Sequence, residues 1–282
     1  MPKLKINPLL GKELRIRMRN WRTFGMISLY LLVLGGFAVL FFLSNFYSLG
    51  RGTSLAEVGR NLFTFLSVSQ FIIVIFLVPA LAGNAISGEK ERQTIDLLVC
   101  TQLTPFRIVT GKLTAALSAV VLLIFASLPL YGFVFLLGGV SPGEVLKLFI
   151  IVLGTALLVG CWSLMFSALF RRTVAAIVAS YVLLFFLLGG SSTLFILLSN
   201  IFYRTQGAVP YFLIMSINPL SFLGWLYPEF FRDILSALGP NWVGRNLQLW
   251  HLALLIQGAM AAFSLWAATR AINPLKLSRK RG

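Results

Sequence analysis

Residues 88–112 read GEKERQTIDLLVCTQLTPFRIVTGK and form the longest charged stretch between two hydrophobic ones. Seven ionic side chains lie in this stretch, whereas residues 61–87 and 113–143 hold no Asp, Glu, Lys or Arg. Because charged side chains are costly within lipid, the contrast places residues 88–112 outside the membrane. We expect this charged stretch to meet another molecule there.

The composition is that of an integral membrane protein. Of the 282 residues, 58% are hydrophobic and 11% are charged, and the mean hydropathy is +0.90, whereas soluble domains carry about 25% charged residues. The uncharged runs exceed the ~20 residues with which a helix crosses hydrocarbon, and they are too continuous for the roughly 10-residue alternating strands of a barrel. We predict one all-α transmembrane domain over residues 1–282, with spans at about 24–43, 62–82, 113–137, 148–169, 174–199 and 247–270.

The distribution of Lys and Arg predicts how these six spans are oriented. Seven precede the first span, four lie in residues 88–112, two are Arg171 and Arg172, and five run from Arg270 onward, whereas the other loops share six. Cytoplasmic loops carry the excess of Lys and Arg, so the predicted topology in the cytoplasmic membrane is N-in and C-in. The net charge of +16 therefore does not indicate nucleic-acid binding, because the basic residues lie in the segments that meet lipid headgroups on the cytoplasmic side. Cys100 and Cys161 lack the spacing of a metal site.

Residues 7–22 are predicted to form an amphipathic helix in the membrane interface. Asn7 followed by Pro8 is a favoured helix start. At about 100° per residue, Trp21 falls on an apolar face, and the opposite face carries Arg15, Arg19 and Arg22. Such a helix lies among headgroups, with the Trp at the interface and the Arg side chains toward anionic lipid. A solvated flank of the first span is the alternative.

Residues 201–246 are hydrophobic enough to suggest a seventh span. However, Pro210, Pro219 and Pro228 would each break a helix there. An odd number of spans would also place the basic C-terminus outside, against the charge rule. We therefore predict short outer helices or a re-entrant hairpin before the sixth span.

The charged stretch itself predicts a short helix on the membrane surface. From Glu89 to Cys100, helical periodicity aligns Glu89, Arg92, Gln93, Asp96 and Cys100 on one stripe. Thr104 followed by Pro105 predicts a second helix start, which leads directly into the third span. The alternative is a solvated loop with no partner.

The same residues resemble a known family. Gly88-Glu89-Lys90-Glu91-Arg92-Gln93-Thr94, then Thr104-Pro105 and Gly111-Lys112, are similar to the loop of ABC-2-type (ATP-binding cassette) transporter permeases. Asn7-Pro8 and Asn218-Pro219-Leu220 also resemble that family, so the likeness spans nearly the whole chain. Gln93 departs from the pattern, because Gly is common at this position, and a helix former here is expected to stiffen the loop.

The resemblance implies a permease subunit, expected to be an exporter, whose residues 88–112 contain a coupling helix that docks on a separate ATPase subunit. The implied ATPase-coupling residues are Glu89, Glu91, Arg92, Thr94, Asp96, Thr104 and Pro105. The resemblance further implies a homodimer, or a heterodimer with a second permease. ATP and Mg are expected in the partner ATPase, because Gly111-Lys112 is followed by Leu113 and the sequence has no phosphate-binding loop. No cofactor or metal is expected in this chain.

In the resembled family the second and fifth helices line the substrate path. Polar side chains in these two spans give the predicted pathway residues Ser67, Gln70, Tyr181 and Ser192. Plain helix packing is the alternative, because small polar side chains often mediate it. No Asp, Glu, Lys or Arg lies near the centre of a span, which counts against a proton-coupled carrier.

Two alternatives to a permease stay open at this point. Ser192 and His251 suggest an intramembrane serine protease, although the sequence contains no Gly-x-Ser-x-Gly motif. A membrane scaffold subunit that transports nothing is the other alternative. We predict that the chain is not itself an enzyme.

Overall fold

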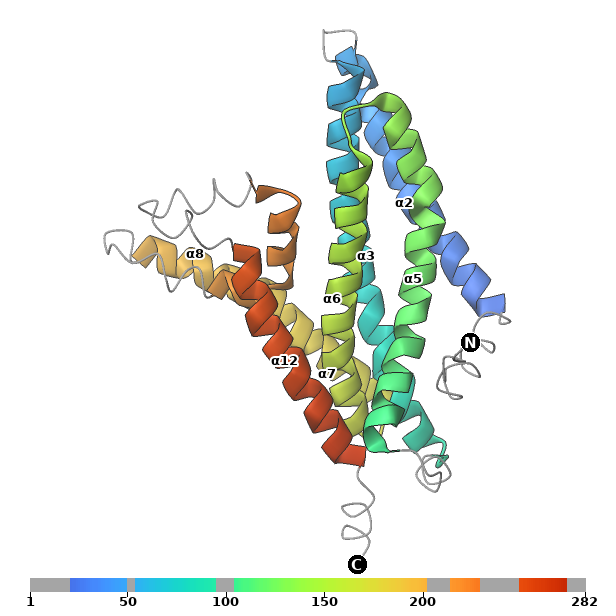
Figure 1. The fold of residues 1–282 in the computed structure, drawn as a ribbon, viewed down its shortest axis with the longest axis vertical. Helices are drawn as coiled ribbons and strands as arrows, with labels where there is room; N and C mark the ends of the chain where they lie inside the picture. The colour runs from blue at the N-terminus through green and yellow to red at the C-terminus, as the bar shows by residue number, and fades with distance from the viewer. Residues whose placement is uncertain (1–20, 50–53, 95–103, 202–213, 229–248, 273–282) are drawn as a thin grey trace, which may run out of the picture.

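The computed structural model describes residues 21–49, 54–94, 104–201, 214–228 and 249–272. Within these ranges every regular element is helical (Figure 1). The elements are α2 (Trp21–Leu49), α3 (Leu55–Glu91), α5 (Pro105–Leu137), α6 (Pro142–Leu169), α7 (Thr173–Phe185), the π-helix η1 (Phe186–Gly190), α8 (Ser191–Ile201), the 3₁₀-helix η2 (Pro219–Trp225) and α12 (Leu249–Ile272).

Six helices in the described part of the chain are long and apolar enough to cross a membrane. The fifth of them, Thr173–Leu198, is built from α7, η1 and most of α8. The prediction of an all-α membrane protein with six spans is therefore confirmed. The second span is longer than expected, because α3 has 37 residues. At ~1.5 Å per residue it is longer than the ~30 Å hydrocarbon core, so its charged end extends outside the membrane.

α6 is the central helix of the bundle, and it packs on α3, α5, α7 and α12 (Figure 1). It begins with a capping box, in which the Ser141 hydroxyl accepts from the Glu144 amide and the Glu144 carboxylate accepts from the Ser141 amide. Small residues let the neighbouring helices approach closely. A Cβ added at Gly160 would lie 3.1 Å from the Leu113 side chain on α5.

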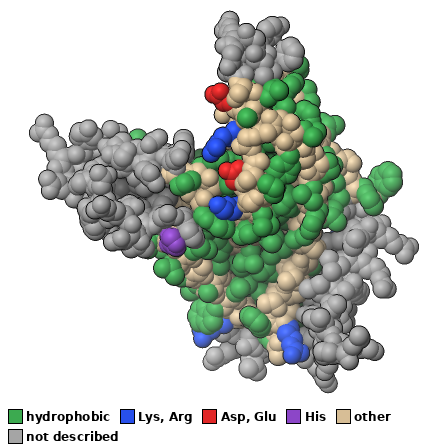
Figure 2. Space-filling view, turned by 45° about the horizontal axis from the view of Figure 1, so that its top comes forward, with side chains coloured by type: hydrophobic (Ala, Val, Ile, Leu, Met, Phe, Trp, Pro, Cys, Tyr) green, Lys and Arg blue, Asp and Glu red, His purple; other side chains and the backbone are tan. Residues whose placement is uncertain are grey.

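The charged side chains separate into two groups at the ends of the bundle. At one end α3, α6 and α12 finish and α5 and α7 begin (Figure 1). The described charged residues at this end are Glu89, Lys90, Glu91, Arg92, Arg107, Lys112, Arg171, Arg172 and Arg270. The opposite end carries Glu57, Arg60, Glu144 and Lys147. On the face shown in Figure 2, acidic and basic side chains alternate near the upper end, whereas only basic ones show at the lower end. This basic excess agrees with the predicted orientation, which stays a prediction.

Only part of the two remaining predicted segments is described. Residues 214–228 hold the short helix η2, and the rest of 201–246 is described only at residue 201, which ends α8. The predicted placement of this region on the outer side stays a prediction. Residues 7–20 of the predicted interfacial helix, with Arg15 and Arg19, lie outside the described residues. Trp21 begins α2 and is 86% exposed, and Arg22 follows it in the same helix.

Candidate functional site at the charged end

The second span runs into the charged stretch without a break. Glu89, Lys90 and Glu91 form the last turn of α3, and Gln93 follows in the left-handed conformation at φ 58°. The predicted start of a separate helix at Glu89 was therefore wrong, because the hydrogen-bonded ladder of the span continues to Glu91. Gln93 does not continue this helix, and the expected stiffening of the loop stays a prediction. A left-handed backbone is where glycine is favoured, so position 93 ends a helix rather than extending one.

A largely buried ion pair joins the two ends of the charged stretch. Lys112 Nζ lies 2.5 Å from Glu89 Oε1, and the Lys112 side chain is only 9% exposed. The other carboxylate oxygen, Glu89 Oε2, is buried without a hydrogen-bond partner. Breaking a buried pair leaves an uncompensated charge, which is more costly than the pair is favourable. The end of α3 is thus fixed to the first turns of α5.

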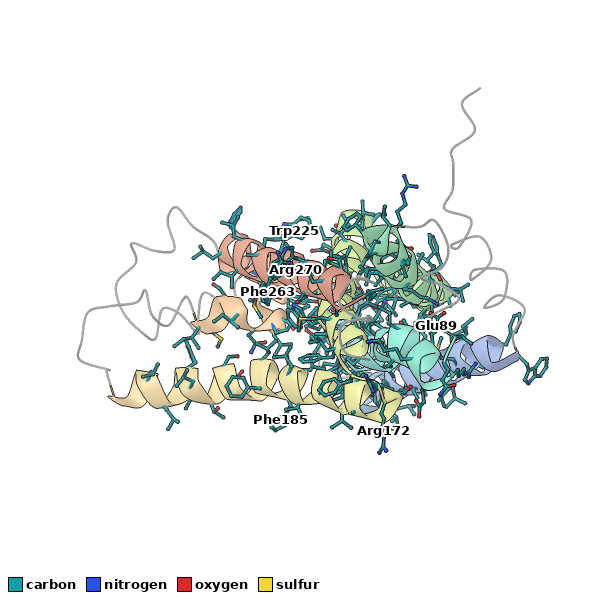
Figure 3. The ribbon with its side chains drawn as sticks, turned by 90° about the horizontal axis from the view of Figure 1, so that it is seen from below. Glu89, Arg172, Phe185, Trp225, Phe263 and Arg270 are labelled. Carbon is teal, nitrogen blue, oxygen red and sulfur yellow. The ribbon has the colours of Figure 1, made fainter. Side chains whose placement is uncertain are left out.

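Glu91 connects α3 to the start of α7. Its Oε2 accepts hydrogen bonds from the Thr173 amide at 3.1 Å and the Thr173 hydroxyl at 2.5 Å. The residue before α7, Arg172, makes no side-chain capping bond, so the carboxylate of another helix satisfies the free amide of α7. These hydrogen bonds from Thr173 hold the pKa of the Glu91 carboxyl below its usual range. Figure 3 views this end of the bundle with Glu89 and Arg172 labelled.

Lys90 and the preceding turn connect α3 to α6. The Lys90 ammonium donates to the Ala168 carbonyl oxygen in the last turn of α6, where a positive charge is favoured by the helix dipole. One turn earlier, Ser167 Oγ accepts from the Ile86 amide at 2.9 Å and the Ser87 amide at 2.8 Å. We name Glu89, Lys90 and Glu91, with their partners Lys112, Ala168 and Thr173, the charged clamp. It fastens one helix end to three others.

The structure divides the predicted ATPase-coupling residues into two groups. Glu89 and Glu91 bind partners within the chain. Arg92, Thr94 and Thr104 are exposed, and Pro105 is half-buried in the first turn of α5. The Thr94 amide and hydroxyl nevertheless both donate to the Glu89 carbonyl oxygen, at 2.9 and 3.2 Å. Asp96 lies outside the described residues. Lys112 and Thr173 were not predicted as site residues. Lys112 could have been found from the sequence, because it is a single Lys next to an uncharged run.

The sequence of this chain matches a known protein family. A family model described as ABC-2 family transporter protein matches residues 8–269. The chain belongs to the ABC-2 transporter family. It is therefore a permease subunit of an ABC transporter, a multi-pass membrane component that is not itself catalytic and whose family typically works with an ATPase partner. A search of the curated proteins finds no match.

Two predicted pathway residues of this permease lie deep inside the bundle. Ser67 and Gln70 on α3 are fully buried. Ser67 Oγ lies 2.5 Å from the Tyr227 hydroxyl, which follows η2, and Gln70 Oε1 accepts from the Tyr131 hydroxyl of α5 at 2.5 Å. The Gln70 amide nitrogen has no hydrogen-bond partner. The two tyrosines were not among the predicted site residues, because nothing in the sequence around either one indicates these contacts.

The other two predicted pathway residues lie in span five. The half-buried Tyr181 donates from its hydroxyl to the Phe76 carbonyl oxygen of α3 at 2.8 Å. Ser192 donates to the Leu188 carbonyl oxygen at 2.7 Å and accepts from Asn218 Nδ2 at 3.0 Å. The Ser192 hydroxyl thus bonds to Leu188 and Asn218 rather than to His251, which is exposed on α12. The geometry therefore does not support the protease alternative. Within the described residues, no group of His, Cys, Asp and Glu is arranged to hold a metal.

Proposed function

We propose that this ABC-2 permease exports a substrate across the cytoplasmic membrane, driven by a separate ATPase that docks against the segment between Arg92 and Thr104. The observation that carries the proposal is the charged clamp. Because Glu89, Lys90 and Glu91 fasten α3 to α5, α6 and α7, a displacement applied beyond Arg92 reaches four helices together. Thr104 and Pro105 start α5 on the other side of the segment, where Pro at the first turn fixes the backbone.

Exposed residues beside the clamp supply the docking chemistry. Arg92, Thr94 and Thr104 project from the basic end of the bundle, and charge complementarity sets partner choice and association rate. In this proposal the partner ATPase holds ATP and Mg, and the charged end faces the cytoplasm, with both termini on that side. Two copies of the chain, or one copy and a second permease, complete the transporter. The proposed pathway residues remain Ser67, Gln70, Tyr181 and Ser192.

The test uses the affinity-tagged permease, purified in mild detergent from its own host together with the ATPase that accompanies it. Arg92→Glu reverses an exposed charge at a residue outside the clamp, next to Glu91, whose pKa the Arg92 charge helps to lower. We expect it to lower the ATP hydrolysis of the purified complex by roughly tenfold, as removing an important interface residue does. The amount of permease in the membrane should stay constant.

Lys147→Glu is the matched control, because Lys147 is also basic and exposed but lies at the opposite end of the bundle. It should leave ATP hydrolysis unchanged. Equal activity of the Arg92→Glu complex and the wild type would refute docking at this segment. Hydrolysis that persists without any transport in reconstituted vesicles would favour the scaffold alternative.

A further inference from the structure

A stripe of polar side chains runs along one side of α3 inside the bundle. Thr64, Ser67 and Gln70 follow one another at helical spacing, so they share this side. Ser67 and Gln70 are fully buried, and Thr64 is half-buried. The neighbouring spans are α2 and α5, which pack against α3 and against each other (Figure 1). Because lipid offers no hydrogen bonds, the buried polar atoms of the stripe need partners inside the bundle.

Tyr131 of α5 supplies one such partner. Its hydroxyl donates to Gln70 Oε1 at 2.5 Å. The Tyr131 ring is fully buried and packs edge-on against the rings of Phe63 and Phe149, with centroids 5.9 and 5.7 Å away. This packing fixes the Tyr131 hydroxyl beside the Gln70 amide.

Two buried polar atoms in the same place have no hydrogen-bond partner. One is Gln70 Nε2, which carries two N–H donors, and the other is the hydroxyl of Tyr30 on α2, a side chain only 5% exposed. The Ser127 hydroxyl lies close to Tyr30 but donates to the Ile124 carbonyl oxygen at 2.8 Å. The hydroxyls of Tyr30 and Tyr131 interact electrostatically, so these groups form one cluster. Unpaired donors are costly in such an environment.

Further polar side chains connect this cluster to the end of the bundle opposite the charged clamp. Ser67, one turn from Gln70, lies 2.5 Å from the hydroxyl of Tyr227. Tyr227 is half-buried and interacts electrostatically with Arg60 and Glu144, of which Arg60 is exposed. A small polar molecule therefore meets polar side chains from the surface of the bundle to Gln70.

We propose that Tyr30, Gln70 and Tyr131 form a buried binding site for water. The water oxygen accepts from Gln70 Nε2 and from the Tyr30 hydroxyl, and one water hydrogen is donated to the Tyr131 oxygen. These are about three hydrogen bonds, the usual number for a water buried in a protein. The three side chains are uncharged, so the site takes a neutral oxygen rather than an ion. The site goes beyond the proposed transport function, since it needs neither an ATPase nor a substrate.

Radiolytic hydroxyl-radical footprinting tests the site, because radicals made from a bound water oxidise the side chains next to it even where bulk solvent does not reach. The full chain is used in lipid nanodiscs without any ATPase. Mass spectrometry gives the oxidation rate of each residue, normalised to the intrinsic reactivity of its side chain. Phe71 is the internal reference, because it is an equally buried aromatic residue of α3. We expect Tyr30 and Tyr131 to be oxidised at least about fivefold faster than Phe71, as neighbours of an ordered water.

Gln70→Leu removes the amide that holds the water and keeps a side chain of similar size. We expect it to lower the oxidation rates of Tyr30 and Tyr131 roughly twofold or more, because the water loses one of its partners. Gln257→Leu is the matched control, since Gln257 is an equally buried glutamine that bonds to backbone carbonyls near η2 instead. It should leave both rates unchanged. Tyr30→Phe removes a single hydroxyl, and we expect it to lower the Tyr131 rate more weakly.

Two results would overturn the proposal. One is oxidation of Tyr30 and Tyr131 that is no faster than that of Phe71 in the wild type. The other is a Tyr131 rate that is the same in the wild type, Gln70→Leu and Tyr30→Phe, which would mean that other groups hold the water. If Gln70→Leu also raises the oxidation of Phe71, the bundle has loosened and the Tyr30→Phe rate decides. Neither result bears on ATPase docking, because no ATPase is present.

Discussion

At the scale of single residues, Glu91 shows how a side chain suited to an outside partner can be engaged inside the chain. Its position next to Arg92 in an exposed turn suggested docking on another protein. The structure uses the carboxylate to cap α7 through the Thr173 amide and hydroxyl. In the proposed mechanism, Glu91 transmits a movement within the permease and Arg92 contacts the partner ATPase.

The cap at Glu91 predicts a specific dependence of stability on pH. Hydrogen bonds lower the folded-state pKa of this carboxyl below its ordinary value of 4.5. A lowered pKa means that the stabilisation is fully present above that ordinary value and is lost as the pH falls through the lowered one. We expect Glu91→Gln to lower the Tm at pH 7, and the difference from wild type to shrink below about pH 4.

Thermal unfolding of the two proteins in the same detergent, measured across this pH range, checks the prediction. Glu57→Gln is the control, since Glu57 is an exposed carboxylate in the first turn of the same helix at its other end. A difference in Tm between Glu91→Gln and wild type that stays constant from neutral to acidic pH would argue against the cap.

At the scale of helices, the central α6 holds the bundle together through close approach of small residues. Gly160 faces Leu113 and Val78 at 3.1 and 3.6 Å from its added Cβ, whereas Gly154 on the same helix has nothing within 4 Å. Gly160→Leu should therefore destabilise the permease by about 1–3 kcal/mol through overpacking. Gly154→Leu should be neutral, or slightly stabilising through its higher helix propensity.

The stabilities of these two variants, measured by unfolding in mixed micelles, separate the effect of side-chain packing from the effect of helix propensity. Since both introduce the same side chain into the same helix, the difference between them isolates the contact with α3 and α5. Similar stabilities for the two variants would show that α6 is not packed as closely as described.

The helices were largely predictable because lipid imposes one simple requirement, a run of about 20 uncharged residues for each span. Thr104 and Pro105 were also predicted correctly as the start of a helix, because their effect is local. The charged clamp was not predicted, since Lys112 and Thr173 meet Glu89 and Glu91 only when four helices pack. The π turn was missed for a related reason. The run Gly189-Gly190-Ser191-Ser192 indicates close packing, but the Leu188 carbonyl oxygen of this turn accepts a hydrogen bond from Asn218, which is far away in the sequence.

At the scale of the whole molecule, the charged clamp connects one end of the bundle to several spans. It joins α3, α5, α6 and α7 at the basic end. In the other half, the π-helix η1 lies between α7 and α8 within span five. We infer that ATP-driven displacement enters through the clamp and moves these four helices together.

The most direct test of this account is photo-crosslinking in native membranes, from a reactive side chain placed at Thr94 or at Lys147. Both positions are exposed, and they lie at opposite ends of the bundle. We expect Thr94 to crosslink to a polypeptide with a phosphate-binding loop, identified by mass spectrometry, and Lys147 not to do so. Crosslinking of such an ATPase from Lys147, with none from Thr94, would contradict it.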